Sequence, residues 1–321
     1  MTRRALVTGG AGFIGSHVTD ALIASGYDVE ILDNLSSGRE SNIPPGVTLH
    51  RMDVGDADAA TVVREGRYDV ICHLAAQIDV RKSVDDPVYD ARVNILGSLN
   101  LMEGVRASRR TTRVVFSSTG GALYGDFVTP PHIESYAKDP ESPYGIAKMS
   151  VEYYLAYYGR VHKLDTAVLR YANVYGPRQD AHGDAGVIAI FCNRILDERP
   201  LTIYGDGRQT RDYVFVKDVA RANALCAAGA LPPAGRMDER GFNIGTATET
   251  DVLGLVAALQ AAAGSSAPVE HVPARAGELA RSSLRIEKAA TVLGWQPTVS
   301  LSDGLRETFE WFAAQRTASA T

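Results

Sequence analysis

Short apolar runs alternate with longer amphipathic segments through the first half of this chain of 321 residues. Near-continuous apolar runs are typical of parallel strands buried on both faces of a sheet, and the segments between them are long enough for crossover helices. The pattern therefore predicts an α/β fold with a doubly wound parallel sheet. The expected strands are Ala5–Thr8, Val29–Asp33, Val47–Met52, Val70–Leu74, Arg113–Ser118 and Thr166–Arg170, and the expected helices are Gly15–Ser25, Tyr89–Ala107 and Tyr144–His162.

After Tyr171 the alternation becomes less regular, and clusters of glycine and proline separate shorter elements. This change predicts a smaller C-terminal α/β lobe. We place the division between residues 1–171 and 172–321, and we expect the two parts to be partly interleaved. The elements expected here are strands at Leu201–Tyr204, Tyr213–Val216 and Phe242–Ile244, helices at Val252–Ala263 and Leu301–Phe312, and a frayed tail at Thr317–Thr321.

The composition is that of an ordinary globular protein, with 45% hydrophobic residues and a net charge of −5. Such a chain has no general attraction for nucleic acid or an anionic membrane, so any anionic ligand must be held by a local site. Its three cysteines form no closely spaced pair, and no run of about 18 apolar residues occurs. We expect a cytoplasmic protein with free thiols, no metal, and neither nucleic acid nor membrane as a partner.

A glycine-rich turn, Gly9-Gly10-Ala11-Gly12-Phe13-Ile14-Gly15, follows the first expected strand. Glycines at these spacings let the backbone approach a pyrophosphate, which then lies at the N-terminus of the next helix. Asp33 ends the second strand 18 residues after Gly15, where a carboxylate accepts from the adenosine ribose and repels a 2′-phosphate. The arrangement predicts a Rossmann-type domain that binds NAD rather than NADP. A purely structural turn is the alternative.

The ends of the third and fourth strands are further candidates for this cofactor site. Asp53 closes the third strand and could reach the adenine amino group, or it could be a polar strand end only. The small residues Ala75 and Ala76 follow the fourth strand and would let the backbone pass close to the cofactor. His73 has no carboxylate or cysteine at ligand spacing, so we interpret it as a hydrogen-bonded histidine near the core.

Tyr144 and Lys148 are spaced to share one face of an expected helix, and the strand before that helix ends at Thr119. A free phenol has a pKa of about 10, so a tyrosine base needs about 4 kcal/mol of charge stabilisation. The ammonium of Lys148 and a nicotinium ring could supply much of it. The hydroxyl of Thr119 could bind the substrate oxygen. By itself this spacing is typical of a solvated helix face, but after a dinucleotide turn it indicates a catalytic pair.

Taken in order, these motifs resemble the extended short-chain dehydrogenases, and most closely the UDP-glucose 4-epimerases. The resemblance runs from Ala5 to about Trp311 and includes Thr8–Gly15, Ser117–Gly125, Ser142–Lys148, Arg170–Gln179 and Gly205–Val216. It implies reversible C4 epimerisation of a UDP-hexose, UDP-glucose or UDP-galactose, through a 4-keto sugar, with tightly bound NAD. In that reaction Tyr144 is the base, and Lys148 and Thr119 are the other catalytic residues.

The resemblance also implies a set of binding residues. The NAD contacts would be Gly9, Gly12, Phe13, Ile14, Gly15, Asp33, Asn34, Asp53, Val54, Leu74, Ala75, Asn94, Tyr144, Lys148 and Ala172. The contacts with the UDP-sugar would be Thr119, Tyr144, Asn173, Gly186, Val187, Ile188, Thr202, Ile203, Tyr204, Arg211, Arg275 and Ser282.

Some of these positions depart from the family pattern. Thr119 replaces a serine but keeps the hydroxyl, Ala172 replaces a bulkier residue, and Glu278 replaces an aspartate after Arg275. Ser282 lies where some members carry a tyrosine that crowds the sugar C2 substituent, so serine would leave room for an acetamido group. The alternative is a solvated loop residue at Ser282, and for Arg211 and Arg275 it is a surface ion pair.

The same scaffold also supports other functions. In a nucleotide-sugar 4,6-dehydratase an Asp-Glu pair follows the active-site threonine, whereas Gly120, Gly121 and Ala122 follow Thr119 here. A non-catalytic NAD sensor typically lacks the tyrosine or the lysine. The same chemistry on UDP-N-acetylglucosamine or UDP-glucuronate stays open.

The two longest expected helices of the first half, Tyr89–Ala107 and Tyr144–His162, carry apolar residues beyond a single core-facing stripe. Members of the family usually pair these helices across a two-fold axis, so the resemblance implies a homodimer through a four-helix bundle. Helices buried within one subunit are the alternative.

Overall fold

The computed structural model describes residues 2–126, 128–180, 186–274 and 279–320. Residues 318–320 are described by their backbone only. Seven of the described strands form one parallel sheet in the order β11-β6-β5-β4-β1-β2-β3. Their bounds are β1 Arg4–Thr8, β2 Asp28–Asp33, β3 Thr48–Arg51, β4 Val70–His73, β5 Arg113–Thr119, β6 Asp165–Tyr171 and β11 Gly241–Ile244. The strand order changes direction between β1 and β4, and ligands of such sheets bind outside the carboxyl ends of the strands at that point.

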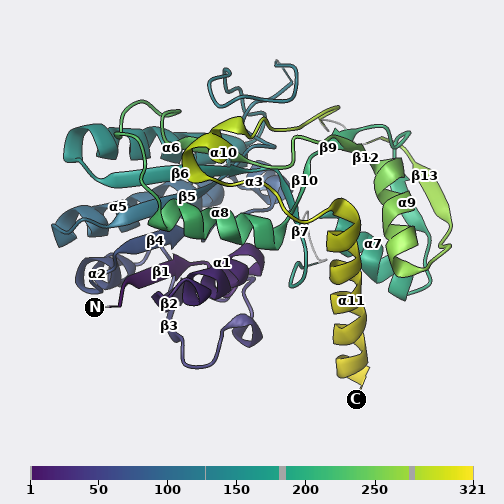
Figure 1. Cartoon of the computed structure of the whole chain (residues 1–321), viewed down its shortest axis with the longest axis horizontal. Coiled ribbons are helices and arrows are strands. Elements are labelled where there is room, and N and C mark those ends of the chain that lie inside the picture. Colours follow the sequence, from purple (N-terminus) through teal and green to yellow (C-terminus); the bar gives the residue numbers. More distant parts are fainter. Residues whose placement is uncertain (1, 127, 181–185, 275–278, 321) are drawn as a thin grey trace.

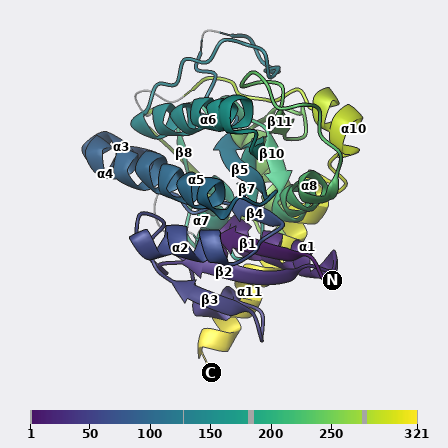
Figure 2. The ribbon, with the colours of Figure 1, turned by 90° about the vertical axis from the view of Figure 1, so that its left-hand side faces the viewer.

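Helices cover both faces of the sheet (Figures 1 and 2). On one face lie α1 (Phe13–Ala24), α8 (Val216–Ala228) and α10 (Glu287–Leu293), and on the other lie α2 (Ala57–Glu65), α5 (Gly97–Ser108) and α6 (Pro143–His162). Each layer has its own apolar core, built on Val18, Leu22 and Trp295 on the first face and on Leu101, Val151 and Leu155 on the second. The doubly wound Rossmann-type sheet predicted from the sequence is confirmed.

The second part of the molecule is built from three short strand pairs and three helices around a third apolar core (Figure 1). The pairs are β7 (Asn173–Tyr175) with β10 (Tyr213–Phe215), β9 (Thr210–Arg211) with β12 (Thr250–Asp251), and β8 (Leu201–Tyr204) with β13 (Val269–Val272). The helices are α7 (Val187–Leu196), α9 (Val252–Ala263) and α11 (Leu301–Ala320). None of the helices in the described part of the chain has the length and apolar character that crossing a bilayer requires.

Three sequence predictions were wrong in detail. The strand expected at Phe242–Ile244 in the second part is β11, which instead extends the central sheet because it pairs with β6. The frayed tail is helical as far as Ala320, since α11 continues beyond Phe312 and Arg316 is anchored to Asp197 at 2.5 Å.

The third concerns the helix expected at Tyr89–Ala107, which is not continuous. It is α4 (Pro87–Ala91), a π-helical segment η2 (Arg92–Leu96) and then α5, preceded by the short helix α3 (Val80–Asp85). A short 3₁₀ segment, η1 (Glu40–Asn42), follows β2. π-Helical turns are rare and are found mostly at functional sites. This one carries Asn94, which is buried against the end of β4.

Candidate active site

The glycine-rich turn between β1 and α1 fits closely against the chain that follows β4. Gly9 has a φ of +70°, and a Cβ on it would lie 2.8 Å from Ala75 N. A Cβ on Gly15 would lie 2.0 Å from Gly9 O, so only glycine fits at either position. No side chain caps the N-terminus of α1, which begins at Phe13. Its first N–H groups and the helix dipole are therefore suited to a pyrophosphate.

Asp33 lies at the carboxyl end of β2, directly beside this turn. Its Oδ2 accepts the N–H of Ala11 at 3.0 Å, and its Oδ1 accepts the N–H of Leu35 at 2.8 Å. The carboxylate thus holds the turn in place while each oxygen keeps acceptor capacity for a hydroxyl donor. Asn34 donates to Asp53 Oδ2 at 2.9 Å, so these two predicted cofactor residues also lie together. Asp53 does not close its strand as expected, since β3 ends two residues earlier at Arg51.

His73 is a structural residue at the end of β4. Its Nδ1 and Nε2 lie 2.7 Å from Thr8 Oγ1 and 2.9 Å from Ser98 Oγ. Burial lowers the pKa of His73 to about 3, so the imidazole is neutral. The interpretation as a hydrogen-bonded core histidine is confirmed. Thr8 Oγ1 also accepts the N–H of Ala75 at 3.2 Å, which fixes the small residues after β4 against the glycine turn.

Tyr144 lies in the first turn of α6. Ser142 caps the helix by accepting the N–H of Gly145 at 3.1 Å, and the N–H of Tyr144 donates to Ser83 Oγ on α3 at 3.2 Å. Lys148, one turn further, donates to Ser117 O at 2.9 Å, and its Nζ lies 5.8 Å from the centre of the Tyr144 ring. The predicted helix face is therefore present, with both side chains at the carboxyl end of β5.

Burial shifts the pKa values of both side chains of this pair. Burial raises the pKa of Tyr144 above its ordinary range, and the carboxylate of Asp90 raises it further. Burial also lowers the pKa of Lys148 to about 8. In the protein alone the phenol is therefore not activated, and the expectation that Lys148 and a nicotinium ring together lower its pKa stays a prediction for the enzyme with NAD bound.

Thr119 and Asn173 converge on the same edge of the sheet. A Cβ on Gly121 would lie 4.0 Å from Thr119 Oγ1 and 3.8 Å from Asn173 Oδ1. Register explains this, since Thr119 pairs with Tyr171 and the chain continues two residues to Asn173. Thr119 Oγ1 accepts the N–H of Ala122 at 3.1 Å, which orients the hydroxyl oxygen. Ala172 connects the end of β6 to the start of β7 and is partly buried.

The residues predicted to bind the uridine differ in how exposed their side chains are. Ile188 and Ile203 are each 1% exposed and pack in the third core, so the accessible side chains of their segments are Val187, Thr202 and Tyr204. Thr202 donates to Glu270 Oε1 at 2.5 Å. Gly186 precedes α7 with a φ of +71°.

The remaining predicted substrate residues lie around β9. Arg211 donates to the carbonyls of Thr210 and Leu279, both at 2.8 Å. Ser282 is 3% exposed and its N–H donates to Thr210 O at 3.2 Å, so the solvated-loop alternative is wrong. Arg275 and Glu278 lie outside the described residues.

Two of the NAD residues implied by the resemblance have side chains committed to the protein. Val54 is 4% exposed in the second core. Asn94 donates both amide hydrogens, to Gln77 O at 3.0 Å and to Asp90 Oδ1 at 2.9 Å. Sequence reasoning missed Ser83 and Asp90, which contact or influence the catalytic pair from α3 and α4. The only signal for Asp90 is that it precedes Asn94 by one helical turn.

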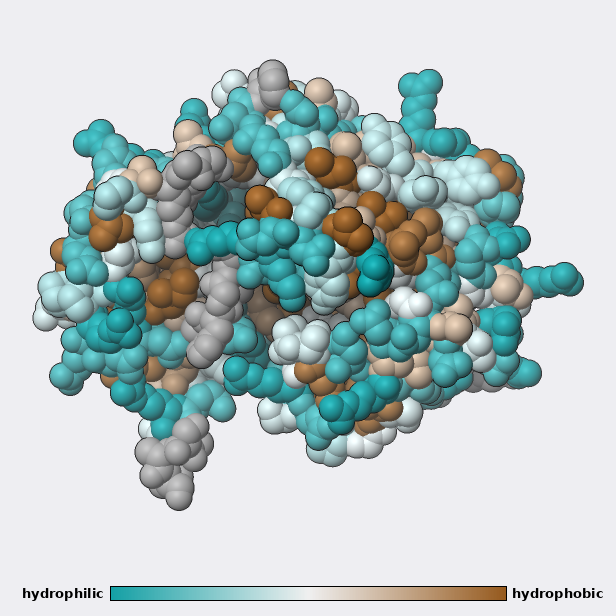
Figure 3. Space-filling view, turned by 180° about the vertical axis from the view of Figure 1, so that it is seen from behind, coloured by the Kyte–Doolittle hydropathy of each residue, from teal (hydrophilic) through white to brown (hydrophobic). Residues whose placement is uncertain are grey.

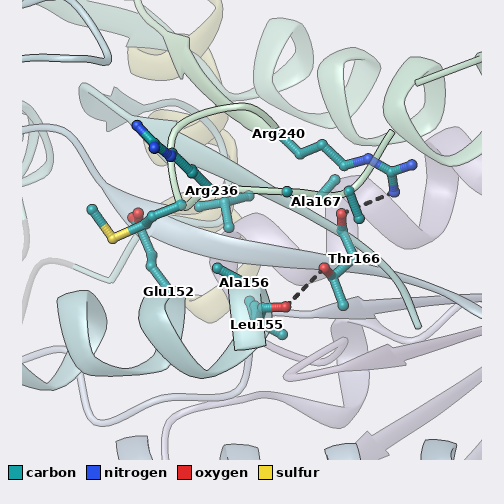
Figure 4. A pocket seen from close by; sticks show the side chains of 11 residues that line it. Glu152, Leu155, Ala156, Thr166, Ala167, Arg236 and Arg240 are labelled. Atoms are coloured by element: carbon teal, nitrogen blue, oxygen red, sulfur yellow. Dashed lines mark hydrogen bonds between the residues drawn. The ribbon is translucent and has the colours of Figure 1, made fainter. Parts of the chain in front are cut away.

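A small cavity lies between α6, β6 and the chain segment around Arg236, and Tyr144 is not among the residues that line it (Figure 4). It measures about 20 Å³ and is bordered by Leu155, Thr166 and Arg240. Thr166 donates to Leu155 O at 3.2 Å and Arg240 donates to Thr166 O at 3.3 Å across it. Such a volume holds a water molecule and not a sugar, so this cavity is separate from the candidate site.

Comparison with known proteins agrees with this geometry. The sequence model of the NAD dependent epimerase/dehydratase family matches residues 5–245. The chain belongs to this family. The resemblance to the extended short-chain dehydrogenases is thereby confirmed.

Three similar proteins cover almost the whole chain. A UDP-glucose 4-epimerase of Mycolicibacterium smegmatis is 45% identical over 314 residues, which are 96% of this chain and 98% of that protein. The crystal structure of a Thermotoga maritima UDP-glucose 4-epimerase with UDP-glucose has a TM-score of 0.92 at 44% identity, covering 98% of this chain and 99% of the other. The Thermus thermophilus UDP-glucose 4-epimerase in complex with NAD has a TM-score of 0.88 at 43% identity, covering 97% and 99%.

Proposed function

We propose that this protein is an NAD-dependent UDP-glucose 4-epimerase, an isomerase that interconverts UDP-glucose and UDP-galactose. The observation that carries the proposal is the placement of Tyr144, Lys148 and Thr119 at the sheet edge that also holds the dinucleotide turn. The names of the similar proteins support the same reaction.

The residues around the turn fit NAD. The uncapped start of α1, the close approach of Gly9 to Ala75 and the carboxylate of Asp33 suit a pyrophosphate followed by a ribose with a free 2′-hydroxyl. When bound, NAD accepts the hydride from C4 of the sugar and returns it. Asp33 favours NAD over NADP, because a 2′-phosphate would lie beside a carboxylate that is 7% exposed.

Tyr144 accepts the proton of the sugar 4-hydroxyl and later returns it. Burial opposes its ionisation, so the phenolate needs positive charge nearby, which Lys148 supplies and the nicotinamide ring of bound NAD would add. Lys148 is held toward the ring by its bond to Ser117 O. Thr119 presents an oriented hydroxyl to the same sugar oxygen and shares the proton.

The second part of the molecule would hold the UDP group. We assign Asn173 and Arg211 to the diphosphate and sugar, and Gly186–Ile188 and Thr202–Tyr204 to the uridine, with Arg275 as a second phosphate cation. Cations are required, because a buried diphosphate without them would be prohibitively costly in a chain of net charge −5. The division into residues 1–171 for NAD and 172–321 for the nucleotide sugar is part of this proposal.

Ser282 favours a second substrate. It is buried and small at the position where a tyrosine would crowd the sugar C2, so the pocket would accept UDP-N-acetylglucosamine as well as UDP-glucose. UDP-glucuronate stays an alternative. A 4,6-dehydratase is disfavoured, because Gly120, Gly121 and Ala122 after Thr119 supply no acid for elimination.

We further propose a cytoplasmic homodimer. The surface of α3 to α6 exposes apolar side chains, among them Val88 at 68%, Leu96 at 58% and Tyr153 at 57%. Figure 3 looks onto this face and shows apolar groups gathered among polar ones. A two-fold axis that pairs these helices into a four-helix bundle would cover them. Sedimentation of the purified protein tests the dimer.

The function is tested by incubating the purified protein with UDP-glucose, UDP-N-acetylglucosamine and UDP-glucuronate and identifying the products by chromatography. UDP-galactose is the expected product of the first. Tyr144→Phe is the matched control, because it keeps the ring and removes the proton acceptor. Formation of a 4-keto-6-deoxy sugar, or no product at all, would contradict the proposed function.

A further inference from the structure

Asp90 is a buried carboxylate that no step of the proposed reaction uses. It lies in α4, is 1% exposed and makes no ion pair among the described residues. Its Oδ1 accepts from Gln77 Nε2 at 3.0 Å and from Asn94 Nδ2 at 2.9 Å. Its Oδ2 is buried without a hydrogen-bond partner in the described part of the chain. A charge left in this condition is costly unless a nearby cation compensates it.

The neighbouring cation is Lys148 of α6, the helix that packs against α4. Asp90 and Lys148 attract each other, and Asp90 and the phenol of Tyr144 are close enough for the carboxylate to raise the pKa of that phenol. Asp90 thus faces both members of the catalytic pair from the helix opposite.

The other charged groups around this pair are already balanced. Glu152, one turn after Lys148, also attracts its ammonium, but less than Asp90 does, and its carboxylate is paired with Arg170 at 2.6 Å. His73 on β4 is neutral, since burial lowers its pKa to about 3. Asp79 uses its carboxylate to cap α3. Lys82 of α3 is exposed, and its ammonium lies over the ring of Tyr89. Among the described residues, Asp90 is therefore the carboxylate near Lys148 that has no ion pair of its own and the larger effect on the ammonium.

We propose that Asp90 is a positioning residue for the epimerase reaction: its carboxylate, fixed by the amides of Gln77 and Asn94, is the counter-ion that keeps the buried Lys148 charged. The inference rests on the proposed function for the roles of Tyr144 and Lys148. Burial lowers the pKa of Lys148 to about 8, and the attraction of Asp90, followed by that of Glu152, opposes this fall. The same negative charge raises the pKa of Tyr144. Asp90 therefore shifts the pKa values of both residues, and with them both limbs of the pH profile, to higher pH.

The test is Asp90→Asn, which removes the charge and keeps an amide oxygen that can accept from Gln77 and Asn94. Both limbs of the pH profile of kcat/KM for UDP-glucose are expected to move to lower pH, by on the order of one pH unit. Asp85→Asn is the matched control, because Asp85 is exposed at the end of α3 and the substitution changes the net charge equally. A merely structural role for Asp90 would lower kcat at every pH and leave both limbs in place.

A second measurement does not depend on turnover. The chain holds six lysines, so NMR of protein labelled at the lysine Cε can follow each one, with Lys148→Arg giving the assignment. The pKa of Lys148 should be lower in Asp90→Asn than in the wild type and unchanged in Asp85→Asn. Equal values in all three would overturn the role of Asp90, whether or not UDP-glucose is the substrate. If Asp90→Asn fails to fold, Asp90→Ser gives the same comparison. A wild type that does not epimerise UDP-glucose would instead overturn the proposed function.

Discussion

The protonation of Lys148 should set the alkaline limit of activity. Lys148 is 3% exposed, and burial lowers the pKa of its ammonium to about 8. With that pKa the side chain is about 90% protonated at pH 7 and about 10% protonated at pH 9. With NAD bound, the nicotinamide charge would bring the pKa of Tyr144 below that of Lys148. Loss of the ammonium then removes a cation that stabilises the phenolate, so kcat/KM for UDP-glucose should fall as pH rises through about 8, and then roughly tenfold per pH unit.

The assay is the pH dependence of kcat/KM in the wild type and two arginine variants. Lys148→Arg keeps a charge that does not titrate below about pH 12, so its profile should lose this limb even though the changed shape lowers the rate. Lys163→Arg makes the same exchange at an exposed lysine and should keep the limb. A wild-type profile without a fall above pH 8, or an identical fall in Lys148→Arg, would refute the reasoning.

Four further outcomes are expected. Tyr144→Phe should retain NAD while kcat falls about 10²–10⁴-fold, and near-normal turnover would exclude this residue as the base. Asp33→Ala should release NAD on purification and lose discrimination against NADP, measured by extracting the bound nucleotide; unchanged retention would contradict the assignment. Ser282→Tyr should cost UDP-N-acetylglucosamine about 1–3 kcal/mol more than UDP-glucose in kcat/KM, and equal losses would remove the gatekeeper role. Glu152→Ala should lower the free energy of unfolding in urea by about 3–5 kcal/mol, because it leaves the buried guanidinium of Arg170 with a single remaining carboxylate.

Features set by local patterns could be predicted from the sequence. The first six strands of the sheet lie where apolar runs indicated them, with ends shifted by a residue or so. The turn from Gly9 to Gly15 and the shared helix face of Tyr144 and Lys148 also follow from spacing alone, because each depends on residues within one or two turns of chain.

Features that depend on distant contacts could not be predicted. β11 carries an apolar run like those of the other short strands, and only its pairing with β6, more than 70 residues earlier, makes it the edge of the central sheet. Burial of Ile188 and Ile203 likewise follows from the packing of α7 and β8 in the third core. An apolar residue near a ligand motif and an apolar core residue look the same in a sequence.

The charges of the catalytic pair show the same limit most clearly. Spacing placed an ammonium beside a phenol, and from that pair alone the pKa of Tyr144 should fall. The structure adds what spacing omits, the desolvation of both groups and a carboxylate from α4. Asp90 is held in place by Asn94 of the π-helical segment η2, which follows α4: Asn94 donates to Asp90 and accepts the N–H of Gln77. The residue types of a site can thus be predicted from the sequence, whereas their pKa values depend on burial and on charges that tertiary packing brings close.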